Sequence, residues 1–253
     1  MKRIITVIIS LIYAATLHAS ETGQQPAIDA AWFKAHYVKN EYMIPMRDGI
    51  RLYTAVYTPK NRRSHHPILL TRTPYGCGPY GRRNASFWQQ AIFEDYLRAD
   101  YIIVFQDVRG RWRSEGEFVN IRPYVADKSS GAIDESSDTY DTVEWLLRKL
   151  KCHNGRVGVF GNSYSGFYAL MAAASGHPAI RAVSPQAPIC DWFLGDDFHH
   201  NGALALSDAV GFLPNFGTAA RTKPTDRPEP FDTPVKGNPV EYLHDNTVAD
   251  ITR

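Results

Sequence analysis

The feature that most constrains the fold of this chain is a short apolar run followed by a tight turn and a helix. The apolar run covers residues 156–160, the turn passes through Gly161-Asn162-Ser163, and residues 164–175 have a helical pattern. Short apolar runs next to glycines are typical of strands that are buried on both faces of a sheet. Because such a strand needs helices packed on both sides of its sheet, the segment predicts an α/β protein.

The same alternation of strands and helices extends along the chain to about residue 212. Asp48-Gly49 joins two extended runs, which is a strong short-range signal of a β-hairpin. The other expected elements are strands at 68–71, 101–105 and 180–184, a helix at 88–99 and a second helix around 140–150 that Ser136 to Asp138 cap. Strands that alternate with helices imply right-handed crossovers and a mostly parallel sheet with flanking helices.

The two ends of the chain differ from this pattern. Lys2 and Arg3 precede an apolar run over residues 4–17, and a small residue, Ala19, follows it. This is the pattern of a signal peptide, so we expect residues 1–19 to be removed and the protein to be exported, either periplasmic or secreted. The run is shorter than the roughly 20 apolar residues that span a bilayer, so no stable membrane anchor is expected after cleavage. Residues 221–238 are polar and rich in proline.

Composition excludes several classes of partner. The formal net charge is only +2 and no block of basic residues stands out, so we expect no nucleic-acid binding. Cys77, Cys152 and Cys190 have spacings that fit neither a zinc site nor a redox pair, and we interpret them as small hydrophobic residues. No metal and no organic cofactor is expected, and the sequence leaves a homo-oligomer open.

Ser163 is the candidate nucleophile. A serine on a sharp turn between a buried strand and a helix has the geometry of a nucleophile elbow. The strained turn requires small neighbours, which Gly161 and Ser165 supply, and it directs the backbone amide of Tyr164 toward the oxyanion of a tetrahedral intermediate. The strict pattern has glycine where this chain has Ser165, so a merely structural turn is the alternative interpretation.

Several blocks around this turn resemble one family. In chain order they are Pro45 to Leu52, Thr71 to Gly76, Asp107 to Gly110, Ser114 to Gly116, Glu144-Trp145, Gly161 to Gly166 and Asp196 to Ala203. Over about residues 42–212 the chain resembles the X-Pro dipeptidyl-peptidase-like (S15) serine hydrolases of the CocE/NonD type. Within that family it is most similar to the α-amino acid ester hydrolases and the glutaryl-cephalosporin acylases.

The resemblance implies an α/β-hydrolase fold and a set of site residues. Ser163 would be the acylated nucleophile, and the Tyr164 amide and the Tyr75 hydroxyl would donate to the oxyanion. Asp197 would bind the α-ammonium group of a substrate, with a capping or surface role as its alternative. Asp107 and Arg109 are interpreted as structural residues that hold loops through paired charges.

The chain offers no clear general base for Ser163. In α/β-hydrolases the acid and the histidine follow the serine along the chain, and the later histidines here are His177, His199, His200 and His244. None of them follows a suitable acid and strand. We therefore expect residues 20–212 to be the N-terminal part of the hydrolase domain and residues 213–253 to be the start of a truncated cap region. The triad acid and histidine would then lie beyond Arg253.

The function expected from the sequence is hydrolysis of small-molecule esters or amides, or of short peptides, through an acyl-enzyme. An α-amino acid ester hydrolase or cephalosporin-acylase-like activity is the first expectation. An X-Pro dipeptidyl peptidase and a broad carboxylesterase stay open as alternatives. A catalytically inactive, truncated binding protein is the alternative from a different class.

Overall fold

The computed structural model describes residues 26–61, 65–81, 91–191, 194–196, 198–212 and 241. The expected signal peptide and nearly all of the expected cap region lie outside these residues. No helix among the described residues is long and apolar enough to cross a membrane.

The main body of the described chain alternates strands and helices, as the sequence predicts. Its elements are α2 (Ala30–His36), β1 (Tyr37–Pro45), β2 (Arg51–Pro59), β3 (His66–Thr73), the 3-10 helix η2 (Ala91–Phe93), α3 (Glu94–Arg98), β4 (Ile102–Asp107), α4 (Glu135–Lys149), β5 (His153–Asn162), α5 (Tyr164–Ala174) and β6 (Ile180–Gln186).

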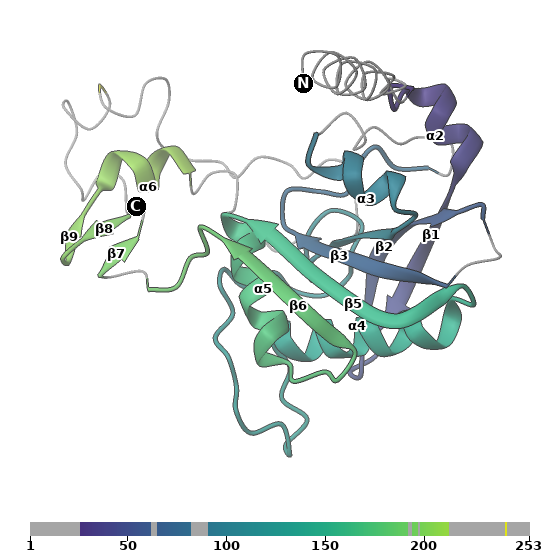
Figure 1. Ribbon diagram of the computed structural model, residues 1–253. Helices are drawn as coiled ribbons and strands as arrows, with labels where there is room; N and C mark the ends of the chain where they lie inside the picture. Colours follow the sequence, from purple (N-terminus) through teal and green to yellow (C-terminus); the bar gives the residue numbers. More distant parts are fainter. Residues whose placement is uncertain are drawn as a thin grey trace, which may run out of the picture.

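Within the described residues, the six strands of the main body form one sheet in the order β1-β2-β4-β3-β5-β6 (Figure 1). The predicted hairpin is present, because β1 pairs with β2 in antiparallel register from Tyr37 opposite Pro59 to Pro45 opposite Arg51. Strand β2 pairs antiparallel with β4, whereas the pairs β4–β3, β3–β5 and β5–β6 are all parallel. The prediction of an α/β fold with a mostly parallel sheet is confirmed.

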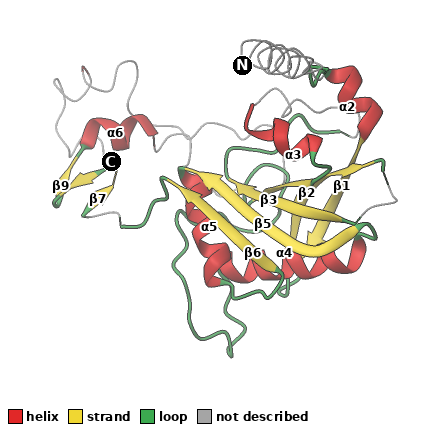
Figure 2. Ribbon diagram, in the orientation of Figure 1, coloured by secondary structure: helices red, strands yellow, loops and turns green. Residues whose placement is uncertain are grey.

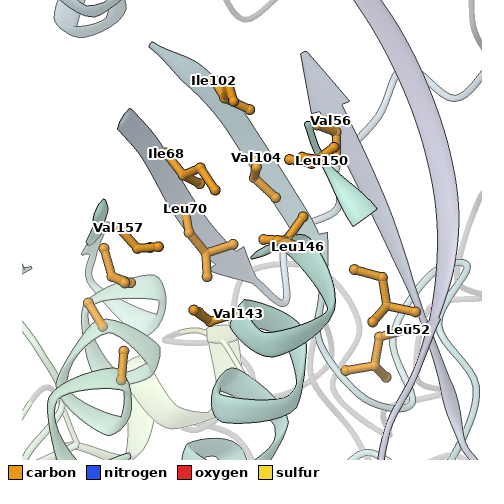
Figure 3. Close-up of a cluster of buried hydrophobic side chains, with 14 of the residues drawn as sticks. Leu52, Val56, Ile68, Leu70, Ile102, Val104, Val143, Leu146, Leu150 and Val157 are labelled. Atoms are coloured by element: carbon orange, nitrogen blue, oxygen red, sulfur yellow. The ribbon is translucent and has the colours of Figure 1, made fainter. Parts of the chain in front are cut away.

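Helices cover both faces of the sheet (Figure 2). On one face, Ile68 of β3 and Val104 of β4 pack with Val143 of α4 (Figure 3). On the other face, Leu69 and Ile103 pack with residues of α2 and α3. Successive residues of the same strand therefore point into two different cores. This double burial explains why the central strands are apolar without alternation.

Three helices differ in detail from the expectations. The helix expected at 88–99 is η2 followed by α3 in its described part, and residues 88–90 lie outside that part. Helix α4 begins with a capping box, in which the Asp134 side chain accepts from the Ser137 amide and the Ser137 hydroxyl accepts from the Asp134 amide. The predicted Ser136–Asp138 cap is therefore correct for Ser137, but it lacked Asp134, which is the N-cap residue. Helix α2 was not predicted from the sequence.

A smaller unit follows β6. Strands β7 (Gly195–Asp196), β8 (His199–His200) and β9 (Ala203–Leu204) form an antiparallel sheet, and α6 (Leu206–Phe212) comes next. The Phe212 side chain packs against the cluster that contains Tyr164, the first residue of α5. This unit therefore lies next to the end of the main sheet at which the candidate nucleophile is found.

Candidate active site

Ser163 lies at the carboxyl end of β5, an inner parallel strand that is flanked by β3 and β6. Its backbone has φ 59° and ψ −123°, a conformation that residues other than glycine rarely adopt. The Ser163 amide donates to the carbonyl of Gln186 in the neighbouring strand over 2.9 Å. The bond to β6 and the start of α5 together hold the residue in this strained turn, as expected of a nucleophile elbow.

Close backbone contacts explain why the turn needs glycine. A Cβ atom at Gly161 would lie 2.0 Å from the Ser165 carbonyl oxygen, and one at Gly166 would lie 2.5 Å from the Gln186 carbonyl oxygen. Ser165, in contrast, has no positive φ, so the fold does not require glycine there. The departure from the strict sequence pattern at Ser165 is therefore compatible with the elbow.

The two serines of the turn differ in burial. The Ser165 side chain is buried, whereas Ser163 is only half-buried. Of these two hydroxyls, the one on Ser163 is accessible to a substrate.

The structure brings Tyr75 to Ser163, although 88 residues separate them in the sequence. The Tyr75 hydroxyl donates to Ser163 Oγ over 3.4 Å, and the Tyr75 residue is 44% exposed. Its ring stands edge-on to the Tyr164 ring, with a centroid separation of 6.5 Å and an interplanar angle of 87°. A phenol thus lies beside the candidate nucleophile, on the solvent-accessible side of the elbow.

Helix α5 begins directly after Ser163, with Tyr164 as its first residue. The amides of Gly166 and Phe167 donate to the Ser163 carbonyl, which closes the first turn. The amides at the start of a helix have no acceptor within the helix, and the helix dipole adds partial positive charge at this end. Both effects favour negative charge near the Tyr164 amide.

The Tyr164 side chain has a separate structural role that the sequence did not indicate. Its hydroxyl accepts from the Ile121 amide over 3.0 Å and donates to Asn120 Oδ1 over 2.9 Å. Burial raises the pKa of this phenol well above its usual range. Tyr164 therefore fixes the loop before α4 against the elbow and stays protonated.

The residues after β4 hold the neighbouring loops. Asp107 accepts hydrogen bonds from the Cys77 amide (2.7 Å) and the Tyr80 hydroxyl (3.0 Å), and burial raises its pKa to about 6. Arg109 contacts Asp138 and Asp48, each at 2.7 Å. The prediction of paired charges is correct for Arg109. Asp107 instead holds the Tyr75 loop through these neutral donors.

A buried ion cluster beneath the elbow was missed at the sequence level. The Arg72 side chain is fully buried, and its Nη2 lies 3.1 Å from Glu135 and 3.6 Å from Asp138. Its guanidinium lies 5.6 Å from the centroid of the Tyr168 ring, which stacks on Tyr164. The only sequence signal is a charged residue near the end of the apolar strand β3.

Of the remaining candidate residues, His177 lies in the described part of the chain and is far from Ser163. His177 follows the far end of α5, about 16 Å along the helix axis from Ser163 at 1.5 Å per residue. Its Nε2 contacts Glu144 over 3.0 Å, and its Nδ1 accepts from the Ala179 amide. Asp197 and His244 lie outside the described residues, and no histidine in the described part of the chain is hydrogen-bonded to Ser163.

The cysteines differ in their environments. Cys77 is buried, Cys152 is half-buried and Cys190 is exposed, and all three are free thiols. The interpretation as buried hydrophobic residues is correct for Cys77 and wrong for Cys190.

Comparisons with known proteins identify the family of this chain. The family model described as X-Pro dipeptidyl-peptidase (S15 family) matches residues 48–246. Cocaine esterase from Rhodococcus sp. (strain MB1 Bresler) is 34% identical over 195 residues, which are 76% of this chain and 31% of the esterase.

Two solved structures are similar at comparable identity. An α-amino acid ester hydrolase has a TM-score of 0.65 and 36% identity, over 79% of this chain and 33% of that one. An aminopeptidase from the marine sediment archaeon Thaumarchaeota archaeon has a TM-score of 0.66 and 34% identity, over 84% of this chain and 34% of that one. The chain thus spans about a third of the length of these relatives. From the family match and these similarities, the chain belongs to the X-Pro dipeptidyl-peptidase (S15) family of hydrolases.

Proposed function

We propose that Ser163 is the nucleophile of a hydrolase that cleaves small acyl esters and amides through an acyl-enzyme. The observation that carries the proposal is the strained backbone of Ser163 between β5 and α5, with φ 59° and ψ −123°. Strain of this kind persists only where the surrounding structure imposes it, and it is frequent at sites of chemistry. The accessible hydroxyl of Ser163 and the family membership support the same role.

In the proposed reaction, Ser163 Oγ attacks the acyl carbonyl carbon and the carbonyl oxygen becomes an oxyanion. The Tyr75 hydroxyl and the Tyr164 amide donate hydrogen bonds to this oxyanion. The alcohol or amine then leaves with a proton, and water hydrolyses the resulting serine ester. The 3.4 Å contact between Tyr75 and Ser163 supports the assignment of Tyr75, because a donor must lie near the bond that forms.

The proposal also needs a general base that accepts the Ser163 proton. His177 does not fit, because both of its ring nitrogens already contact Glu144 and Ala179. We infer that the base comes from a part of the protein outside the described residues. Activity is therefore best measured on the full-length protein.

Labelling with a fluorophosphonate tests the proposal, because this reagent phosphonylates activated serines. Ser163→Ala should abolish labelling, whereas Ser165→Ala should retain it, since Ser165 is the buried serine of the same turn. Equal labelling of wild type and Ser163→Ala would contradict the proposed nucleophile. Equal loss in both variants, with both folded, would also contradict the specific role of Ser163.

We further propose that the acyl group of the substrate carries an α-amino group. Two of the similar structures, at 36% and 34% identity, are named as an α-amino acid ester hydrolase and an aminopeptidase. Asp197 is the proposed partner of the ammonium group, since a carboxylate facing a cation discriminates strongly against an uncharged analogue. A broad carboxylesterase would lack this preference.

This substrate preference is tested by comparing an α-amino ester with its des-amino analogue. The wild type should favour the amino ester in kcat/KM, and Asp197→Asn should remove most of that preference. Asp196→Asn, at the adjacent position, is the matched control and should retain it. The same preference in wild type and Asp197→Asn would remove Asp197 from the proposal.

A further inference from the structure

The loop that carries Tyr75 is fixed at the preceding residue. The Pro74 carbonyl accepts two hydrogen bonds, from Trp112 Nε1 over 2.8 Å and from Arg111 Nε over 3.2 Å. Both donors belong to the segment that follows β4. A carbonyl held by two side chains restricts the peptide bond between Pro74 and Tyr75, and with it the direction in which Tyr75 leaves the backbone.

The indole of Trp112 also fixes the residue that follows Tyr75. Gly76 has φ +99°, and a Cβ atom there would lie 2.6 Å from Cε2 of the Trp112 ring. The ring and the Gly76 backbone are therefore in direct contact. The loop cannot move toward the indole because of this contact, and the hydrogen bond to Pro74 opposes movement away from it.

Trp112 is itself held in an unusual conformation. Its φ of +47° lies in the left-handed region, which residues other than glycine seldom occupy. Two hydrogen bonds close the turn around it. The Ser114 amide donates to the Arg111 carbonyl over 2.9 Å, and Ser114 Oγ donates to the Asp107 carbonyl over 2.6 Å. Asp107 is the last residue of β4, so these hydrogen bonds connect the turn that carries Trp112 to the main sheet.

We propose that Trp112 is a positioning residue, which holds the Tyr75 hydroxyl where it can donate to the oxyanion formed at Ser163. The inference rests on the proposed role of Tyr75. Trp112 acts through the Pro74 carbonyl and Gly76, on either side of Tyr75, and it does not take part in the chemistry. Removal of its N–H group should therefore impair the reaction step more than substrate binding.

The test uses Trp112→Phe, which keeps an aromatic ring against Gly76 and removes the donor to Pro74. In the full-length protein, hydrolysis of p-nitrophenyl acetate should show a kcat lowered about tenfold with KM changed less than about twofold, because displaced catalytic groups lose rate in the reacting complex. Trp145→Phe is the matched control, since Trp145 packs against Tyr42 of β1. It should leave both constants unchanged.

A double-substitution cycle separates positioning from a general loss of structure. If Trp112 acts through Tyr75, then Trp112→Phe should cause almost no further loss of kcat in a Tyr75→Phe background. A full tenfold loss in both backgrounds, or no loss in the wild-type background, would overturn the positioning role alone. If Tyr75→Phe by itself left kcat unchanged, the proposed role of Tyr75 would fail and this inference would fail with it.

Discussion

Replacement of Asp107 by asparagine should change how the stability of the protein depends on pH. The Asp107 carboxylate is buried at the end of β4, and burial raises its pKa from its ordinary 3.8 to about 6. The folded state therefore binds this proton more tightly than the unfolded state does. It follows that the Asp107 contribution to stability increases as the pH falls through about 6 and is lost as the pH rises above it.

The size of the effect follows from the shift in pKa. A rise of about two units corresponds to about 3 kcal/mol between the extremes of pH, at about 1.4 kcal/mol per unit. Between about pH 7.5 and 4.5 the carboxyl group titrates only in part, so roughly 2 kcal/mol of this difference should be observed. The asparagine side chain of the Asp107→Asn variant would not titrate, while its amide oxygen could still accept from the Cys77 amide.

Urea unfolding of the wild type and Asp107→Asn at both pH values is the assay. The difference in unfolding free energy between the two proteins should shift by about 2 kcal/mol in favour of the wild type at the lower pH. Asp127 provides a control of opposite sign, because hydrogen bonds from Ser129 lower its pKa. As the pH falls, the unfolding free energy of the wild type should therefore decrease relative to that of Asp127→Asn. An equal difference at both pH values for Asp107→Asn would refute the reasoning.

Two further substitutions test the elbow and the ion cluster beneath it. Gly161→Ala places a Cβ atom 2.0 Å from the Ser165 carbonyl oxygen. We therefore expect a lower melting temperature, a loss of about 1–3 kcal/mol in the free energy of unfolding, and loss of fluorophosphonate labelling. Labelling at the wild-type level would contradict the packing argument. Asp138→Asn removes a buried carboxylate that contacts both Arg72 and Arg109, and we expect denaturant unfolding to show a loss of about 3–5 kcal/mol. A change within experimental error would show that the cluster is not required for stability.

The sheet could be predicted from the sequence because its central strands are apolar on both faces. Ile68, Leu69 and Leu70 are consecutive and all buried, which is the pattern of a parallel strand between two layers of helices. The hairpin followed from Asp48-Gly49. Helix α2 could not be predicted in the same way, since seven residues contain too few turns to show a period, and its position depends on the burial of Phe33.

The candidate site was predictable where it is local and not where it depends on contacts between distant segments. Gly161, Ser163 and Gly166 belong to one local segment, and the apolar strand before it and the helical pattern after it indicated the elbow. Tyr75 was indicated only by the family resemblance, because 88 residues separate it from Ser163. Nothing in the sequence pairs Trp112 with Pro74, since that contact depends on how the segment after β4 folds back. The predicted signal peptide and the role of Asp197 stay predictions.

Isolation of an acyl-enzyme tests the central claim most directly. The full-length protein is mixed with p-nitrophenyl acetate, quenched in acid and digested with trypsin, which cleaves after Arg156 and Arg181 and releases a peptide containing Ser163, Ser165 and Ser175. Fragmentation of this peptide by mass spectrometry should place one acetyl group on Ser163. An acetyl group on Ser165 or Ser175, or turnover of the ester with no acetylated peptide, would contradict the assignment of Ser163 as the nucleophile.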